Sequence, residues 1–257
     1  KGSMSWIDKD TVYVATDFGP DSMTTSGYPR IVKEWRRGTP LSAAKVVFEG
    51  KKTDMQVTAF YDDTKGYERH FVFCAPAFYK NDLYLRQKDG SLTRIDVPVD
   101  ANAGAHREWM MVTLRSAWEV EGKTYPAGSL LAIKFDAFMQ GKRDFTVLYT
   151  PTDNSSLAGS SWTRNTLILN IMEDVKSKLV VLKPENGVWK EIPFVGAPQN
   201  VEAQAWGIDS DENDDYFMTV TGFLTPSSLY MGSIGKAPEK IKSTPEFFDA
   251  SRMEVSQ

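Results

Sequence analysis

The strongest constraint on the fold is a repeated pattern of short strand-like runs separated by turn residues. Within these runs apolar and polar residues alternate, and β-branched and aromatic side chains are frequent, as is typical of half-buried strands. Turn-forming residues such as Asp89 and Gly90 separate the runs at short intervals. We expect strands over residues 11–16, 71–73, 83–85, 92–95, 109–114, 130–133, 145–149, 166–170, 178–182 and 216–220.

The runs group into larger units that repeat along the chain. Five units begin near Trp6, Gln56, Arg107, Ser161 and Ala203, at intervals of roughly 40 to 55 residues, as in the four-stranded blades of propellers. Hairpins of third and fourth strands are expected at 81–95, 178–192 and 228–241, and a single helical turn at 134–139. The predicted fold class is all-β: a β-propeller of four-stranded antiparallel blades, about five in this chain.

Charge and hydropathy exclude several classes of partner. The chain has 34 acidic and 30 basic residues spread along its length, for a net charge of −4, so it offers no dense basic patch for nucleic acid. No apolar run approaches the ~20 residues that span a bilayer, and the N-terminus lacks a basic and then apolar leader. We expect a soluble chain with neither a nucleic-acid nor a membrane partner, and both the cytoplasm and the periplasm remain open.

Cysteine, histidine and acidic clusters give no sign of a cofactor. Cys74 is the only cysteine and lies in an apolar run, so we expect it in the core. His70 and His106 lack metal-ligand spacing, and we expect no metal and no other cofactor. The acidic stretch 209–215 has no glycine at its sixth position, and Val220 stands at the twelfth, so an exposed hairpin tip is expected rather than a calcium loop.

Several motifs occur in an order that resembles a known family. Residues 223–230 read Phe-Leu-Thr-Pro-Ser-Ser-Leu-Tyr, and residues 247–251 read Phe-Phe-Asp-Ala-Ser. Together they resemble the end of the propeller in the prolyl oligopeptidase family. Residues 5–8, 27–32, 35–41, 106–109, 125–130 and 161–165 are similar, in matching order, to a bacterial branch of that family.

The resemblance implies a domain organisation. The family has a seven-bladed propeller and an α/β-hydrolase domain that holds a serine, histidine and aspartate triad. Residues 1–257 would then be the β-propeller domain, incomplete on its N-terminal side, with the catalytic domain expected after residue 257. No G-x-S-x-G is present, since 159–162 and 232–235 have the wrong spacing. No catalytic residue is carried over, and the chain alone is predicted to be inactive although its parent is expected to be a serine peptidase.

The resemblance also implies a function, that of a gate through which only short peptides reach the catalytic serine. The expected partners are the hydrolase domain of the same polypeptide and short peptides. Candidate gating or interdomain residues are Tyr28 and Arg30, in the turn 27–30, and Arg107. The sequence leaves open which end of a blade Tyr28 and Arg30 occupy, and a structural role is favoured for the stretch 106–109. The alternative is a free-standing propeller that binds proteins or peptides.

Counting blades yields two further expectations. Residues near Ser3, Gln56, Arg107, Ser160 and Ala203 should line the axis, because the first strand of each blade is innermost. Five blades of a seven-bladed ring would expose two apolar blade faces. We therefore expect self-association of the chain in preference to closure of a five-bladed ring, because dense packing resists a change of inter-blade angle.

Overall fold

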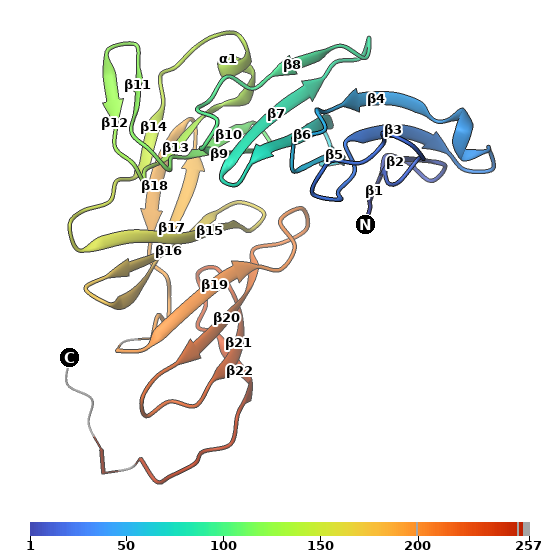
Figure 1. Cartoon of the computed structure of the whole chain (residues 1–257). Helices are drawn as coiled ribbons and strands as arrows, with labels where there is room; N and C mark the ends of the chain where they lie inside the picture. The colour runs from blue at the N-terminus through green and yellow to red at the C-terminus, as the bar shows by residue number, and fades with distance from the viewer. Residues whose placement is uncertain (199, 251, 254–257) are drawn as a thin grey trace. The chain divides into compact units, whose positions relative to one another are not determined.

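The computed structural model describes residues 1–198, 200–250 and 252–253. The chain divides into two compact units, Lys1–Val147 (unit 1) and Leu148–Gln257 (unit 2). Both units consist of antiparallel four-stranded sheets whose strands pair in chain order (Figure 1). The prediction of an all-β fold built from four-stranded antiparallel blades is confirmed.

Unit 1 contains three four-stranded sheets. The first comprises β1 (Ser3–Trp6), β2 (Thr11–Ala15), β3 (Ile31–Arg36) and β4 (Lys45–Glu49), and the second β5 (Gln56–Asp62), β6 (Arg69–Ala77), β7 (Lys80–Arg86) and β8 (Leu92–Arg94). The third comprises β9 (Asn102–His106), β10 (Trp109–Thr113), β13 (Leu130–Lys134) and β14 (Thr146–Tyr149), and the unit boundary falls within β14. The 3-10 turn η1 (Leu41–Ala43), the hairpin β11 (Trp118–Val120) and β12 (Lys123–Tyr125), and the helix α1 (Phe135–Met139) lie in the connections.

Unit 2 contains two four-stranded sheets. One comprises β15 (Ser155–Trp162), β16 (Leu167–Glu173), β17 (Lys176–Glu185) and β18 (Val188–Ile192). The other comprises β19 (Glu202–Gly207), β20 (Asp215–Thr221), β21 (Ser228–Ser233) and β22 (Glu239–Ser243). Among the described residues no helix is long and apolar enough to cross a membrane.

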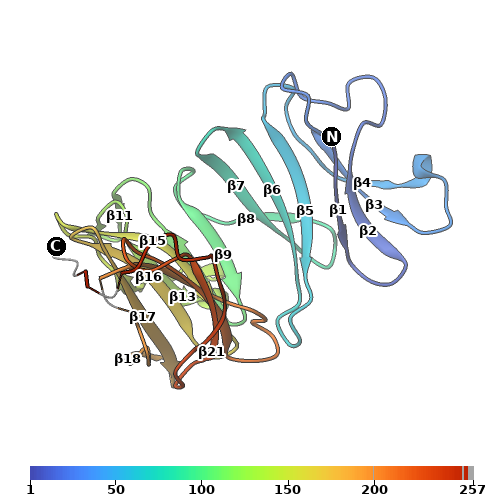
Figure 2. The same cartoon turned by 90° about the horizontal axis from the view of Figure 1, so that it is seen from below.

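The core lies between neighbouring sheets. In unit 1, Tyr13 and Val32 of the first sheet share one apolar cluster with Val57 and Val72 of the second, where β5 lies beside β1 (Figure 2). In unit 2, Ile168 packs with residues of β19 and β20 in the same way. Burying one large apolar side chain stabilises the folded chain by roughly 1.5–3 kcal/mol. A single sheet cannot bury the side chains of both its faces, and stacking against a neighbouring sheet supplies this burial.

The predicted strands and the single helical turn are found in the structure, but three inner strands begin earlier than expected. The inner strands β1, β9 and β15 begin at Ser3, Asn102 and Ser155, whereas the sequence placed the units at Trp6, Arg107 and Ser161. The reason is composition: β9 reads Asn-Ala-Gly-Ala-His, whose small and polar residues carry little strand propensity. The hairpin of β11 and β12 was not expected.

Each sheet has two ends, because its strands alternate in direction. We call the end with the first-to-second strand turns the hairpin end; in unit 1 these turns are 7–10, 63–68 and 107–108. The opposite end, with the second-to-third strand connections and the links between sheets, is the linker end. Contacts between sheets join like ends: Arg69 Nη1 donates to the Arg107 carbonyl (2.7 Å) at the hairpin end, and Asn81 Nδ2 to the Ala101 carbonyl (3.3 Å) at the linker end.

Candidate functional site

The connection between β2 and β3, residues 16–30, is an ordered loop at the linker end of unit 1. Its polar side chains Ser22 and Thr24 are buried. Ser22 Oγ accepts a hydrogen bond from the Phe18 amide (2.8 Å) and donates one to the Gly19 carbonyl (2.6 Å). Buried polar groups that are paired in this way hold a loop in one conformation.

Tyr28 lies near the end of this loop and is half-buried. Its amide donates to Thr24 Oγ1 (3.2 Å), and its carbonyl accepts from the Thr24 amide (2.8 Å). The Lys1 ammonium lies 4.0 Å from the centre of the ring. The backbone therefore fixes the position of an aromatic ring that is partly exposed at the linker end.

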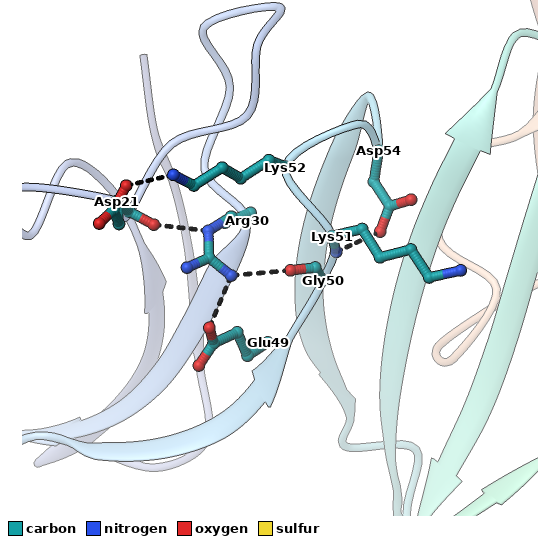
Figure 3. Close-up of polar contacts among 7 residues, drawn as sticks. All are labelled: Asp21, Arg30, Glu49, Gly50, Lys51, Lys52 and Asp54. Atoms are coloured by element: carbon teal, nitrogen blue, oxygen red, sulfur yellow. Dashed lines mark hydrogen bonds and ion pairs between the residues drawn. The ribbon is translucent and has the colours of Figure 1, made fainter.

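Arg30 joins the loop to the segment that leaves the first sheet (Figure 3). Its side chain is only 12% exposed. Nε donates to the Asp21 carbonyl, and Nη1 donates to Glu49 Oε1 (2.6 Å) and to the Gly50 carbonyl (2.9 Å). Two of the three acceptors are backbone carbonyls, so Arg30 holds two stretches of chain together.

An exposed ion pair borders this cluster. The Lys52 ammonium donates to the Asp21 carboxylate, and this bond lowers the pKa of Asp21. Both side chains are more than half exposed, and exposed ion pairs contribute little to stability because water and salt screen them. Arg30, rather than Lys52, is therefore the residue that mainly connects the loop 16–30 to the segment after β4.

Cys74 lies at the same end, in the core as expected. It is 5% exposed, and its Sγ is 3.5 Å from Oδ2 of the buried Asp54, which also accepts a bond from the Lys51 amide. Burial, followed by the charge of Asp54, raises the pKa of the Cys74 thiol to about 12. Since the thiolate is the reactive form, Cys74 is not a nucleophile near neutral pH.

Arg107 lies at the opposite end of the sheets from Tyr28 and Arg30. It is not an inner-strand residue, as the sequence had suggested, but the first residue of the turn between β9 and β10, with φ 49°. Its carbonyl accepts the bond from Arg69, whose guanidinium lies 4.1 Å from the centre of the Phe135 ring. The structure therefore brings Tyr28 and Arg30 to one end and Arg107 to the other.

The hairpin end also holds a polar network that the sequence did not predict. Arg86 Nη1 donates to Glu34 Oε2 (2.6 Å) and to the Tyr13 hydroxyl (3.1 Å), and that hydroxyl lies 2.8 Å from His70 Nδ1. These residues come from β3, β7, β2 and β6, so no motif within one run could have revealed them.

Both imidazoles have lowered pKa values. Burial and then the neighbouring Arg86 lower the pKa of His70. Burial and then Arg107 lower the pKa of His106 to about 4, so both rings are neutral at pH 7. No group of three or more histidine, cysteine or acidic side chains among the described residues is placed to hold a metal ion.

Known proteins are similar to this chain in sequence and in architecture. Residues 1–243 match the family model of the prolyl oligopeptidase N-terminal β-propeller domain. The chain is 28% identical to the uncharacterized peptidase y4nA of Sinorhizobium fredii, over all of this chain and 36% of that protein. It is 27% identical to the uncharacterized peptidase RP174 of Rickettsia prowazekii, over 88% of this chain and 32% of that protein.

This chain is also similar to a solved structure of a peptidase. A post-proline cleaving enzyme from Rickettsia typhi superposes with a TM-score of 0.86 and 26% identity, over 97% of this chain and 37% of that enzyme. The chain thus spans about a third of the length of the peptidases that it matches. From its sheets, its sequence and these matches, the chain belongs to the prolyl oligopeptidase N-terminal β-propeller family.

Proposed function

We propose that this chain is the substrate gate of a serine peptidase of the prolyl oligopeptidase family, and that residues 1–257 form its propeller domain. The observation that carries this proposal is the match of residues 1–243 to the propeller of that family, over about a third of each peptidase relative. The catalytic α/β-hydrolase domain follows in the same polypeptide, and the propeller admits short peptides while folded proteins are excluded by their size.

In each unit we assign the linker end of the sheets, and not the hairpin end, to contact with the hydrolase domain. Since strands alternate in direction, β22 finishes at the linker end of its sheet, as β4 and β8 do in unit 1. A domain that follows the last strand therefore meets unit 2 at the linker end of that sheet. In unit 1, taken by itself, the linker end carries the ordered loop 16–30 and the hairpin of β11 and β12, and ordered loops on a rigid sheet scaffold commonly carry function.

The three candidate residues take different roles under this assignment. Tyr28 offers a half-buried ring to the partner domain, and Arg30 holds the loop that carries it. Arg107, at the hairpin end, is a candidate for the far mouth of the axis. None of the three is a catalytic residue, because the peptide-bond chemistry belongs to the hydrolase domain.

Activity measurements on the whole polypeptide and on this chain test the gate. We expect the whole polypeptide to hydrolyse a short proline-containing chromogenic peptide, with loss of activity on addition of a serine-directed inhibitor, and this chain alone to show none. A folded protein that carries the same cleavage sequence should remain intact. Activity of this chain alone would refute the assignment. Absence of hydrolase activity in the whole polypeptide would favour the alternative, a propeller that binds proteins or peptides.

A matched pair of variants in the whole polypeptide tests the linker end. Tyr28→Ala should loosen the interdomain contact and raise the cleavage of a long unfolded polypeptide several-fold relative to the short peptide, since gating by domain contacts responds to single residues. Lys9→Ala, at a side chain that is 91% exposed at the hairpin end, should leave that ratio unchanged. Equal ratios in both variants would refute the role of Tyr28.

Self-association of this chain stays a prediction. Its support is the first sheet, where Met4, Trp6 and Val46 are 60%, 52% and 57% exposed. Met4 and Trp6 are two residues apart on β1 and so share one face of the sheet, and adjacent exposed apolar side chains favour association. Light scattering over a range of concentrations decides the question, and a strictly monomeric chain that binds no apolar dye would contradict it.

A further inference from the structure

A cleft of about 810 Å³ opens at the hairpin end of unit 1. It lies where turns and strand ends of the first two sheets meet α1, and its lining includes Tyr61, His70, Arg86 and Phe135. Sites for small ligands commonly measure about 300–1,000 Å³ and combine apolar walls with a few polar groups. The size of this cleft therefore suits a ligand of a few residues.

The hydrogen bonds beneath the cleft fix the tautomer of His70. Arg86 has only donors, so the Tyr13 oxygen accepts from it, and the single Tyr13 proton is directed to His70 Nδ1. His70 Nδ1 is therefore the acceptor, and its proton lies on Nε2. The stacked Tyr61 ring, 4.4 Å away centre to centre, holds the plane of the imidazole.

Donors remain available at the cleft. In the part of the chain that the structure describes, His70 Nε2 and the Nε and Nη2 of Arg86 have no hydrogen-bond partner. Arg86 spends only Nη1 on Tyr13 and Glu34, and both Arg86 and His70 line the cleft. A guanidinium and an imidazole N–H form strong, directional hydrogen bonds to a carboxylate.

The charged residues that line the cleft do not suit a ligand with several negative charges, because acidic and basic side chains are both present. The cleft includes the acidic residues Asp8, Glu34, Glu68 and Asp136 against the basic residues Arg69, Arg86 and Lys88. Glu34 is already paired with Arg86, whereas Asp8, Glu68 and Asp136 are exposed. A ligand that places a carboxylate on the donors and an ammonium near the exposed carboxylates matches both sets of charges.

We propose that this cleft binds short peptides by their free carboxylate end, with His70 Nε2 and Arg86 as donors and the partly exposed Tyr61 and Leu85 as apolar walls. The inference takes only the ligand class from the proposed function. Binding at the hairpin end would give the propeller a peptide site separate from the linker end, where the hydrolase domain is assigned. Loss of this site would leave gating at the linker end intact.

Imidazole NMR of the whole 257-residue chain tests the proposal, because the chain has only two histidines. Trialanine with free ends should shift the Nε2 and Hε2 signals of His70 and leave those of His106 unchanged. Its C-terminal amide should bind at least about tenfold more weakly, the effect of losing charge-assisted hydrogen bonds. The N-acetylated form should bind about threefold more weakly, since only exposed carboxylates face the ammonium.

The same experiment contains the results that would overturn the proposal. Equal binding of the amide and the free acid, or an unchanged His70 signal at saturating peptide, would refute carboxylate recognition. Acetate that shifts His70 as strongly as the peptide does would show an anion site without peptide recognition. Because no peptide bond is broken in these measurements, their failure is distinct from failure of the gate.

Variants at His70 separate recognition from folding. His70→Phe keeps a ring against Tyr61 but removes both nitrogens, and it should weaken trialanine binding about tenfold by calorimetry. His70→Gln supplies an amide N–H near the position of Nε2 and should stay within about threefold of the natural chain. Lys80→Gln, at the opposite end of β7, is the matched control and should have no effect. Equal affinity in the phenylalanine and glutamine variants would contradict the role of His70.

Discussion

The linker end and the hairpin end of unit 1 both place an arginine beside a glutamate, yet the two arrangements differ in what they leave unused. Arg30 directs two of its three bonds to backbone carbonyls and ties the loop 16–30 to the segment after β4. Arg86 instead joins side chains of two sheets and leaves two of its nitrogens with no partner among the described residues. An arginine bound to carbonyls stabilises a loop, whereas one with spare donors beside a cleft is suited to bind a ligand.

The largest effect that we expect is at the linker end, where folding should greatly slow the alkylation of the Cys74 thiol. A thiol pKa of about 12, against the ordinary 9.0, lowers the thiolate fraction about a thousandfold in the folded chain. We expect iodoacetamide to label Cys74 at least about a hundredfold more slowly in the folded chain than in urea. Labelling of the folded chain at the rate of the unfolded chain would show that the linker end opens readily. The linker end would then not be the rigid one of the two ends.

Arg30→Met is expected to destabilise the chain by about 3 kcal/mol, because it leaves the Asp21 and Gly50 carbonyls and the Glu49 carboxylate without their donor. Urea unfolding followed by tryptophan fluorescence measures the change. Lys52→Met is the matched control and should have a much smaller effect, since its ion pair is exposed and screened by water. Similar losses in both variants would show that Arg30 is not the main link.

Acid should weaken the hairpin end first. The folded pKa values of His70 and His106 lie below the ordinary 6.5, so the unfolded chain binds more protons as the pH falls. The stabilisation is complete above about pH 6.5 and is lost towards pH 4, and His106 alone contributes about 3 kcal/mol to this loss.

Two measurements check this dependence. The urea concentration at the unfolding midpoint should decrease as the pH is lowered from 6.5 to 5. NMR titration should place the pKa of His106 well below that of a free imidazole. A His106 signal that titrates near pH 6.5 would remove the basis of the prediction.

Tyr13→Phe gives the smallest expected change, about 1 kcal/mol, because the ring remains while one hydroxyl is lost. Its distinctive readout is the His70 tautomer, since Nδ1 no longer receives the Tyr13 proton. We expect the nitrogen shifts of His70 to show a larger fraction protonated at Nδ1, with no change at His106. An unaltered tautomer would show that Tyr13 does not fix the imidazole.

Much of the fold follows from local pattern. The alternation in residues 109–114 predicts β10, and the apolar surroundings of Cys74 predict its burial, because each depends on neighbours along one strand. The strand β9 escaped prediction because its small residues are held by pairing with β10 rather than by their own propensity.

The sequence by itself determined a chain of short antiparallel strands in repeating groups of four, and the family to which those groups belong. The tertiary structure alone decided which residues meet. Tyr13 and His70 are 57 positions apart, and Arg86 and Glu34 are 52 apart, and each pair forms only when the first two sheets stack. Strand direction likewise sends Arg30 and Arg107 to opposite ends, because alternation within a run fixes the face of a side chain but not its neighbours in the next sheet.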